Sequence, residues 1–495
     1  MDRNLLMKKL QHLGISGLFY KNIVAMYTST DYAIKLDLGV LKPIASNLGL
    51  KQGCPLSPIL FNIYIEDIKD IFDDSCEPID LQGTKMNHFL YADDLVLISL
   101  SKTGIQNCLN KLDDYAKGNR LTINIDKTKS MVFNGAGRLL KQDCFLGNTK
   151  LEQIQTFCYL GFEMKTSGVV SAAVNTLYDK ASKAMRPLMG VISRFDIPVK
   201  TALTLFHTYI SPIALYAVEN WAILSENKIL RFGEETIFID VVNNKPDILH
   251  RQFLKFLLGT SRSCPNMAVY GEMGEIPLSL KAYRLLLKYW YRLTFMPDKT
   301  LVKKALLENI RLRTKWIKTI EKLIGQLNLS QFPETINKFG KTLSENLKQK
   351  FLNFWAKNIT ESDSRLSFYG QIKQEFKLEP YLNLSDFRLR KTIAKFRCSD
   401  HTLEIERGRH KKIPRDQRIC KVCLSNNIET ETHFLINCEF FEHIRNSTGL
   451  VKSTDCRTIL RDTDPEVLGK YLIEAFLARR DYLEGRTVDD TEWVG

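Results

Sequence analysis

The sequence predicts an α+β protein in which a mixed N-terminal region precedes a long, mostly helical region and a small zinc-binding unit. Short apolar runs bounded by turn residues occur between residues 31 and 165, as is typical of antiparallel strands. From about residue 168 onward, apolar residues recur at helical spacing. Near the C-terminus, three cysteines and one histidine have the spacing of zinc ligands.

Composition and charge are those of a soluble globular protein with two to four domains, because 44% of the 495 residues are hydrophobic and 25% are charged. The formal net charge is +14 and is unevenly distributed. Residues 1–165 contain 19 Lys and Arg against 18 Asp and Glu, whereas residues 166–495 contain 51 against 38. The basic excess of the second part indicates a polyanionic partner, most simply nucleic acid. Charge alone is equally consistent with a generally basic, solvated surface.

The N-terminal residues do not resemble a signal peptide, because Lys8 and Lys9 interrupt a very short apolar run. No apolar run approaches the roughly 20 residues that cross a bilayer, so we expect no membrane association. The eleven cysteines are an odd number and are scattered, which favours reduced thiols and an intracellular protein. A nuclear or a cytoplasmic location remains open.

Two adjacent acids, Asp93 and Asp94, lie between apolar runs in the stretch from 88 to 99. Such a pattern predicts a β-hairpin with both carboxylates at its tip. Taken alone, the pair is explained by the turn preference of aspartate.

Three further blocks accompany this hairpin and change its interpretation. They are LGLKQGCPLSP at 48–58, LTINIDKTK at 121–129 and FCYLG at 157–161. In this order, the four blocks resemble the reverse transcriptases of LINE-type (non-LTR) retrotransposons. The resemblance covers about residues 1–230 and 385–445.

This resemblance implies a partial fingers-palm fold followed by a helical thumb, and an RNA-directed DNA polymerase that uses two Mg²⁺ ions. Asp93 and Asp94 are then the magnesium ligands, and Lys127 lies near the leaving pyrophosphate, where a cation stabilises developing charge. Gln52, Gly53 and Tyr91 are expected at the nucleotide pocket. The expected partners are an RNA template and a DNA primer or target.

Local sequence patterns predict the helices and strands on which these blocks lie. We expect a helix over residues 3–13 with Leu13 on its apolar side, and a helix that begins at Pro58 with Ser57 as its N-cap. A helix over 105–115 with Leu109 and Leu112 inward precedes strands at 121–124 and 130–133. The YLG block at 159–161 resembles the hairpin that supports the primer end, although a packed strand and turn explain it equally well.

Polymerases of this family use a third carboxylate on an earlier palm strand, and no such strand is recognisable here. Asp2 is too close to the start of the chain to belong to it, and the acidic stretch from Asp70 to Asp80 has the pattern of a solvated loop. The alternative function is therefore a catalytically inactive, nucleic-acid-binding remnant.

The second candidate site is the Cys420, Cys423, His433 and Cys438 set, with the spacing C-x2-C-x9-H-x4-C. Three thiolates and one imidazole are a common ligand set for structural Zn²⁺, and the resemblance includes such an element after the thumb. The residues from Arg388 to Lys421 contain 12 Lys and Arg against 4 acids. We expect this basic segment to grip the template RNA or target DNA, although a protein-contact role is equally compatible with the sequence.

The expected domains are 1–165 (partial fingers and palm), 166–232 (helical thumb), 233–386 (α-helical connection), 387–445 (basic segment with the zinc-binding unit) and 446–495 (C-terminal helix and acidic tail).

Overall fold

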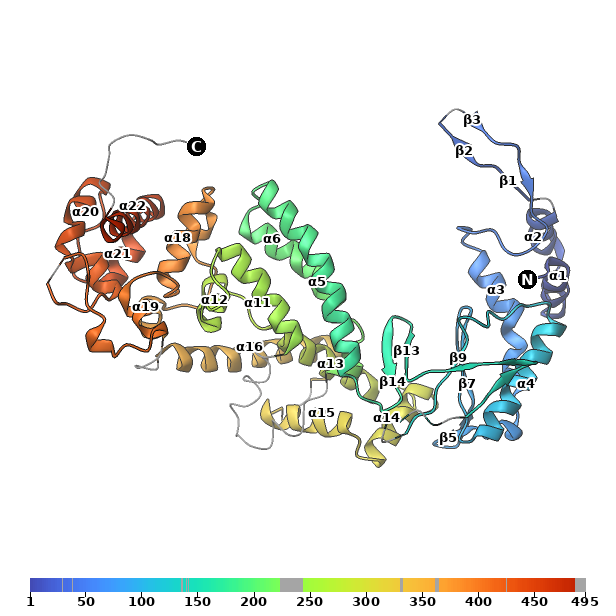
Figure 1. Ribbon diagram of the computed structural model, residues 1–495. Helices are drawn as coiled ribbons and strands as arrows, with labels where there is room; N and C mark the ends of the chain where they lie inside the picture. Colours follow the sequence, from blue (N-terminus) through green and yellow to red (C-terminus); the bar gives the residue numbers. More distant parts are fainter. Residues whose placement is uncertain are drawn as a thin grey trace. The chain divides into compact units, whose positions relative to one another are not determined.

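The computed structural model describes residues 1–28, 30–37, 39–134, 137–138, 140, 142–222, 244–329, 333–360, 365–423 and 425–485. The chain divides into two compact units. The N-terminal unit consists of Met1–Val169 and Met296–Leu312, and the helical unit of Val170–Phe295 and Arg313–Gly495 (Figure 1). The expected acidic tail at 489–492 and the expected thumb and connection residues 223–243 lie outside the described residues.

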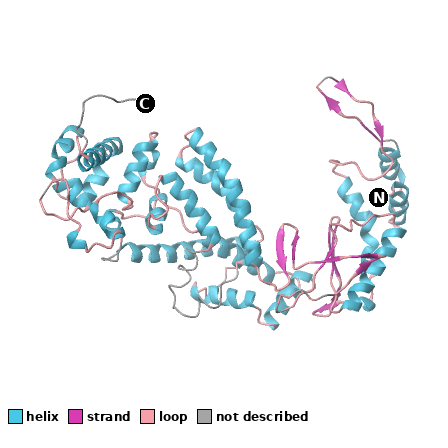
Figure 2. Ribbon diagram, viewed as in Figure 1, coloured by secondary structure: helices cyan, strands magenta, loops and turns pink. Residues whose placement is uncertain are grey.

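All described strands belong to the N-terminal unit (Figure 2). They form two-stranded sheets, all antiparallel except the parallel pair β9 and β12. The strands are β1 (Asp31–Tyr32), β2 (Lys35–Leu36), β3 (Gly39–Val40), β4 (Ile44–Ala45), β5 (Ile79–Leu81), β6 (Thr84–Met86), β7 (His88–Tyr91), β8 (Asp94–Leu97), β9 (Lys129–Ser130), β10 (Phe145–Leu146), β11 (Thr149–Lys150), β12 (Glu152–Gln153), β13 (Thr156–Tyr159) and β14 (Phe162–Lys165). The helices of this unit are α1 (Arg3–His12), α2 (Gly17–Thr28), α3 (Ser57–Ile65), the 3-10 helices η1 (Glu66–Ile71) and η2 (Asp74–Cys76), α4 (Lys102–Gly118) and α14 (Leu301–Arg311). The predicted mixture of helices and strands is confirmed at this level.

The first core of this unit forms where α1, α2 and α3 pack together. Leu6 and Leu10 of α1 are fully buried against Leu60 and Tyr64 of α3. The prediction that Leu13 shares this face is wrong, because Leu13 is the C-cap of α1 and is 57% exposed. The helix ends there and Gly14 follows with φ 82°, so the apolar stripe does not continue.

The second core lies between α4 and β8. Leu109 and Leu112 of α4 are buried, as predicted, and Leu95 and Leu97 of β8 pack against the same cluster. The predicted strand at 121–124 is absent. Its apolar residues, including Ile123, still pack into this core, but a turn stabilised by Asn124 follows directly and prevents strand pairing. Of the predicted strand at 130–133, only the first residue is in a strand, because β9 ends at Ser130.

The helical unit is built from long helices and short turns. Its helices are α5 (Ser171–Arg194), α6 (Val199–Leu205), the π-helix η3 (Phe206–Ile210), α7 (Ser211–Ala214), α8 (Val218–Trp221), α11 (Lys245–Leu258), α12 (Asn266–Met273), α13 (Leu278–Thr294), α15 (Lys315–Gln326), α16 (Ile336–Thr360), α17 (Ser367–Ile372), η4 (Pro380–Asn383), α18 (Phe387–Arg397), α19 (Glu404–His410), η5 (Arg415–Gln417), the π-helix η6 (His433–Asn437), η7 (Glu439–Phe441), α20 (Glu442–Thr448), α21 (Cys456–Asp462) and α22 (Pro465–Glu484). Helix α5 packs on α11, α13 on α16, and α18 on α22. Among the described helices, none combines the length and apolar character needed to cross a membrane.

A buried carboxylate holds α12, η4 and α18 together. Glu272 of α12 is fully buried and accepts two hydrogen bonds from the guanidinium of Arg397, at 2.9 and 3.1 Å. Tyr381 donates a third hydrogen bond at 2.7 Å. Complete burial opposes ionisation of Glu272, but Arg397 and Lys373 together lower its pKa below the usual value.

A second buried acid, Asp247, joins the start of α11 to the start of α13. It is fully buried and accepts a hydrogen bond from the backbone N–H of Ser279 at 3.0 Å and another from the hydroxyl of Ser279. Burial raises the pKa of Asp247 to about 7, because these bonds and the cation Arg251 offset the loss of solvation only in part.

We expect Asp247→Asn to stabilise the protein progressively relative to the native chain as pH rises. The pKa of Asp247 is raised in the folded state, so the folded state holds its proton more tightly than the unfolded chain does. Native stability is then lost between about pH 4 and pH 7, by up to about 4 kcal/mol, whereas asparagine has no proton to lose. Urea unfolding of both proteins at several pH values measures the difference. A difference that stays constant from pH 4 to pH 8 would contradict the interpretation.

Candidate functional site

The predicted hairpin at Asp93 and Asp94 is confirmed. Strands β7 and β8 pair antiparallel from His88 with Leu97 to Tyr91 with Asp94. The two-residue turn consists of Ala92, which has φ 52°, and Asp93. Left-handed backbone is what a tight two-residue hairpin turn requires. Asp93 therefore lies in the turn itself and Asp94 begins the returning strand, and both side chains are exposed.

A second hairpin follows later in the N-terminal unit. Strands β13 and β14 pair antiparallel, so the 159–161 block forms the predicted hairpin turn. Burial and the negative charge of Asp94 raise the pKa of Tyr159. The end of β13 is therefore within electrostatic range of the acidic tip.

No third carboxylate joins Asp93 and Asp94 in a group close enough to share a metal ion, among the residues that the structure describes. Two acids of the loop at 70–80 form ion pairs with lysines. Asp73 pairs with Lys111 at 2.7 Å, which lowers the pKa of Asp73 to about 2, and Asp74 pairs with Lys85 at 2.7 Å.

Asp2 has a local role. It caps α1 by accepting a hydrogen bond from the N–H of Leu5 at 3.0 Å, and it forms an ion pair with Arg120. These contacts lower the pKa of Asp2 and account for the residue without a metal.

The loop before Gln52 is held by a residue that the sequence patterns did not reveal. Arg3 is only 7% exposed and has no carboxylate partner among the described residues. Its guanidinium donates to the carbonyl oxygens of Gly49 at 2.9 Å, Tyr27 at 3.1 Å and Ser46 at 2.5 Å. A buried guanidinium that binds several carbonyls fixes the backbone over that span. No periodicity or motif signals such a contact.

Gln52 and Gly53 lie in an exposed turn after this loop, and Gly53 has φ 79°. The prediction that Ser57 is the N-cap of the next helix is wrong. Ser57 is the first residue of α3 and its hydroxyl donates to the carbonyl of Lys51 at 2.6 Å. The serine therefore ties the Gln52–Gly53 turn to the helix and does not satisfy the N–H groups of the helix.

Lys127 is exposed in the turn that follows residue 124. The side chain of Asn124 accepts a hydrogen bond from the N–H of Lys127 at 3.0 Å, which fixes the backbone. Because Ile125 packs into the same core as Leu95 of β8, this turn and the acidic hairpin are anchored to one body.

The four predicted zinc ligands converge. Their ligand atoms all lie within 4.8 Å of one another, and Cys423 Sγ is 3.3 Å from His433 Nε2. Cys420, His433 and Cys438 are buried and Cys423 is half-buried. A hydrogen bond with Cys438 lowers the pKa of the Cys420 thiol to about 3 and raises the pKa of Cys438. Three sulfurs and one imidazole in this arrangement fit a tetrahedral zinc ion.

The spacing between His433 and Cys438 is explained by a π-helical turn, η6. Residues five apart on an α-helix point about 140° away from each other, because each residue turns by about 100°. In η6 the N–H of Cys438 bonds to the carbonyl of His433 at 2.8 Å, an i to i+5 bond that turns both side chains to one side.

A buried ion pair lies next to the cysteine cluster. Arg479 of α22 binds both oxygens of Glu429 at 2.6 and 2.7 Å, and both side chains are almost completely buried. Glu429 Oε1 in turn lies 3.8 Å from Cys420 Sγ. The His401 ring contacts Glu431 at 3.1 Å, two residues before the ligand His433.

The expected basic segment at 388–421 is only partly available to a ligand. Arg390 and Arg397 are buried, and the latter binds Glu272. The exposed cations with no ion pair to a described residue gather after α19, at Lys411, Lys412 and Arg415. A count of charges in the sequence therefore overstates the cationic surface.

A second row of exposed cations lies on α5. Lys180, Lys183 and Arg186 recur every three residues on its exposed side, opposite the buried Leu177 and Ala181.

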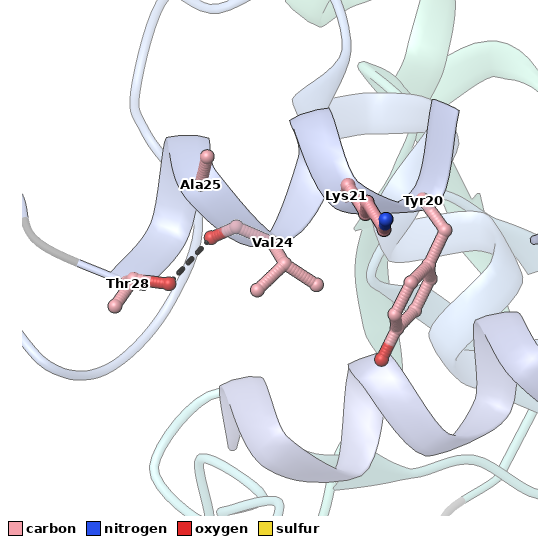
Figure 3. A pocket seen from close by; sticks show the side chains of 5 residues that line it. All are labelled: Tyr20, Lys21, Val24, Ala25 and Thr28. Carbon is pink, nitrogen blue, oxygen red and sulfur yellow. Dashed lines mark hydrogen bonds between the residues drawn. The ribbon is translucent and has the colours of Figure 1, made fainter. Parts of the chain in front are cut away.

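A surface hollow lies along α2, lined by Tyr20, Lys21, Val24, Ala25 and Thr28 (Figure 3). Thr28 donates its hydroxyl hydrogen bond to the carbonyl of Val24 at 2.8 Å. The hollow contains none of the predicted site residues and no carboxylate, so we assign it no role in the chemistry.

Replacement of Arg479 by methionine is expected to destabilise the zinc-binding unit strongly. Glu429 then remains buried without a counter-charge, which costs about 3–5 kcal/mol. Urea unfolding and the rate of zinc release to a chromogenic chelator measure the effect. Arg480→Met is the matched control, because Arg480 is exposed and pairs only with Asp481 among the described residues, so its loss costs about 1 kcal/mol or less. Equal effects of the two substitutions would contradict a supporting role for Arg479.

Residues 3–164, which extend from α1 to β14, match the family described as reverse transcriptase (RNA-dependent DNA polymerase). Similar proteins include a retrovirus-related Pol polyprotein from the type-1 retrotransposable element R2 of Popillia japonica, 28% identical over 145 residues, and one from the type-2 element R2DM of Drosophila melanogaster, 27% identical over 201 residues. A Transposon TX1 uncharacterized 149 kDa protein of Xenopus laevis is 25% identical over 134 residues.

These matches cover 26%, 37% and 27% of this chain. They cover 23%, 18% and 10% of the respective relatives, so the chain matches less than a quarter of the length of each.

Proposed function

Because residues 3–164 form a reverse transcriptase domain related to those of LINE-type, non-LTR retrotransposons, we propose that this chain acts in RNA-directed DNA synthesis with Asp93 and Asp94 as its metal-binding carboxylates. The observation that supports this most directly is the exposed acidic hairpin tip, with Asp93 in the turn and Asp94 at the start of β8. The N-terminal unit is then a partial fingers and palm, and the helical unit contains the thumb and the zinc-binding unit.

Asp93 and Asp94 suit Mg²⁺ because they offer hard carboxylate oxygens on a hydrogen-bonded turn. When bound, two such ions stabilise the attacking and leaving oxygens of nucleotidyl transfer. Neither carboxylate forms an ion pair with a described Lys or Arg, so both are available. A complete site requires a third carboxylate in addition to this pair.

The remaining predicted residues position the nucleotide in this proposal. Gly53, with its left-handed backbone, lets the chain approach a ligand closely, and Gln52 and Tyr91 present exposed side chains. Lys127 supplies positive charge for the departing pyrophosphate. The Arg3 contacts keep the Gln52 loop in one conformation before substrate binds.

The helical unit supplies the grip on nucleic acid. The cations at Lys180, Lys183 and Arg186 face outward on a single helix and are suited to the phosphates of a primer-template duplex. The zinc-binding unit, with its Cys420, Cys423, His433 and Cys438 ligands, holds the exposed cations after α19 in a fixed position. Zn²⁺ has a structural role there, because all four ligands come from the protein.

Primer extension on an RNA template with Mg²⁺ tests the catalytic part of the proposal. We expect extension by the native chain and a loss of more than about 100-fold in Asp93→Asn/Asp94→Asn, because changes in the surroundings of a metal site alone cost about 10–100-fold. Asp126→Asn is the matched control, since Asp126 is an exposed acid in a neighbouring turn. Extension that persists in the double variant would contradict the assignment. No extension by the native chain, with RNA binding retained, would instead identify an inactive nucleic-acid-binding protein.

The grip of the zinc-binding unit is tested by Lys411→Gln/Lys412→Gln/Arg415→Gln. We expect weaker binding of single-stranded RNA and a shallower dependence of affinity on salt, by about 0.7 for each phosphate that is no longer neutralised. The control Lys338→Gln/Lys341→Gln/Lys348→Gln removes the same charge from the exposed side of α16. Fluorescence anisotropy at several salt concentrations measures both. Equal changes in the two triple variants would show that only net charge matters.

A further inference from the structure

Three potential metal ligands from separate elements of the helical unit meet outside the zinc-binding unit. His207 lies in η3, His250 in α11, and Glu275 follows α12. His207 Nε2 is 2.9 Å from Glu275 Oε2, and His250 Nε2 is 3.6 Å from the same oxygen. One ligand atom from each residue lies within 4.8 Å of the others.

The local backbone at two of the three residues departs from regular helix in a way that brings them together. His207 belongs to a π-helical turn, a feature that often marks functional positions. Glu275 follows Gly274, which has φ 62° and lies so close to Leu378 that a Cβ there would be 2.5 Å from its backbone nitrogen. Only glycine fits, and the resulting turn directs the chain at Glu275 back toward α11.

The surroundings of the His250 ring point to a bound ligand. Its side chain is fully buried, and neither ring nitrogen has a hydrogen-bond partner among the described residues. One face of the ring stacks on Phe206, with centroids 5.1 Å apart and planes 17° apart. A buried polar atom without a partner is unfavourable, and a coordinate bond to Nε2 removes that cost at one nitrogen.

The separations suit a small divalent ion. Two ligand atoms bound to Zn²⁺ at about 2.0–2.1 Å in tetrahedral geometry are about 3.3 Å apart. The two distances to Glu275 lie on either side of this value. The side chains of His207 and Glu275 are 33% and 21% exposed, so one side of the cluster is open to water.

Two cations lie near this cluster. Lys281 and Arg251 both act electrostatically on His250, and the ammonium of Lys281 is held by the hydroxyl of Ser211 at 3.1 Å. Their repulsion of a divalent ion is opposed by the Glu275 carboxylate, whose pKa is lowered because hydrogen bonding by His207 and the charges of His250 and His207 outweigh its burial. An imidazole-rich ligand set selects a transition metal over Mg²⁺ or Ca²⁺, which prefer oxygen ligands.

We propose that His207, His250 and Glu275 form a second metal site, which binds one divalent transition-metal ion such as Zn²⁺ with water in the remaining position. The ion joins the π turn, α11 and the end of α12. It is separate from the Cys-Cys-His-Cys cluster and does not depend on polymerase activity. The competing interpretation is a hydrogen bond between His207 and Glu275 beside a core histidine, with no metal.

Zinc stoichiometry of the full chain tests the proposal. The protein is saturated with Zn²⁺, freed of unbound metal by desalting, and analysed by elemental mass spectrometry. We expect two zinc ions per native chain and one in His207→Ala and in Glu275→Gln. We also expect one in Cys423→Ser, which damages only the cysteine cluster, and two in His12→Ala, which removes an exposed histidine of α1.

Cobalt substitution identifies which site is lost and shows that the variants are folded. The thiolate-to-cobalt charge-transfer absorption of the cysteine cluster is expected to be unchanged in His207→Ala and Glu275→Gln, while the weaker absorption of a thiolate-free site disappears. One zinc ion per native chain, lost only in Cys423→Ser, would overturn the proposal. Because neither readout involves RNA or nucleotides, failure here is distinguishable from failure of the proposed polymerase function.

Discussion

Burial of the Glu272 carboxylate constrains the arrangement of α12, η4 and α18 in the helical unit. A charge removed from water must be paired and hydrogen-bonded, or its cost exceeds the stability of a domain. Arg397, Tyr381 and Lys373 meet this requirement only if α12, η4 and α18 stay in one arrangement. The pairing therefore holds α12 in a fixed position against η4 and α18, which follow it much later in the sequence.

Both clusters of potential metal ligands in this unit are connected to that pairing. On one side, α12 continues through Gly274 to Glu275, beside the two histidines. On the other side, α18 continues to Ser399 and His401, which both contact Glu431, two residues before the ligand His433. The Glu272 pairing is thus joined through α12 and α18 to the elements that present both ligand sets.

The sequence predicts features that depend on local chemistry. The acidic hairpin and the cysteine cluster were predictable, because turn residues and ligand spacing act over a few residues. For the 159–161 block the sequence left a hairpin and a packed strand with a turn equally open, and the structure has a hairpin there. Arg3 was not predictable, since its acceptors are backbone carbonyls that only the folded chain brings together. The same holds for His207, His250 and Glu275, which no spacing rule connects. The predictions of an N-cap at Ser57 and of a strand at 121–124 were wrong, because tertiary hydrogen bonds and packing outweighed the local conformational preference of these residues.

The contacts of the charged side chains, and not the number of charges in the sequence, distinguish structural from functional residues in this protein. In the N-terminal unit, Asp67, Asp73 and Asp74 each form an ion pair with a lysine. In the helical unit, Arg390 and Arg397 are buried, which leaves a smaller cationic surface than the sequence suggests. Asp93 and Asp94 differ from these acids, because two like charges stand side by side on an exposed turn with no cation among the described side chains to balance them. Such an arrangement is electrostatically unfavourable by itself and becomes favourable when a divalent cation binds. This contrast supports the proposal that the acidic tip binds a divalent cation.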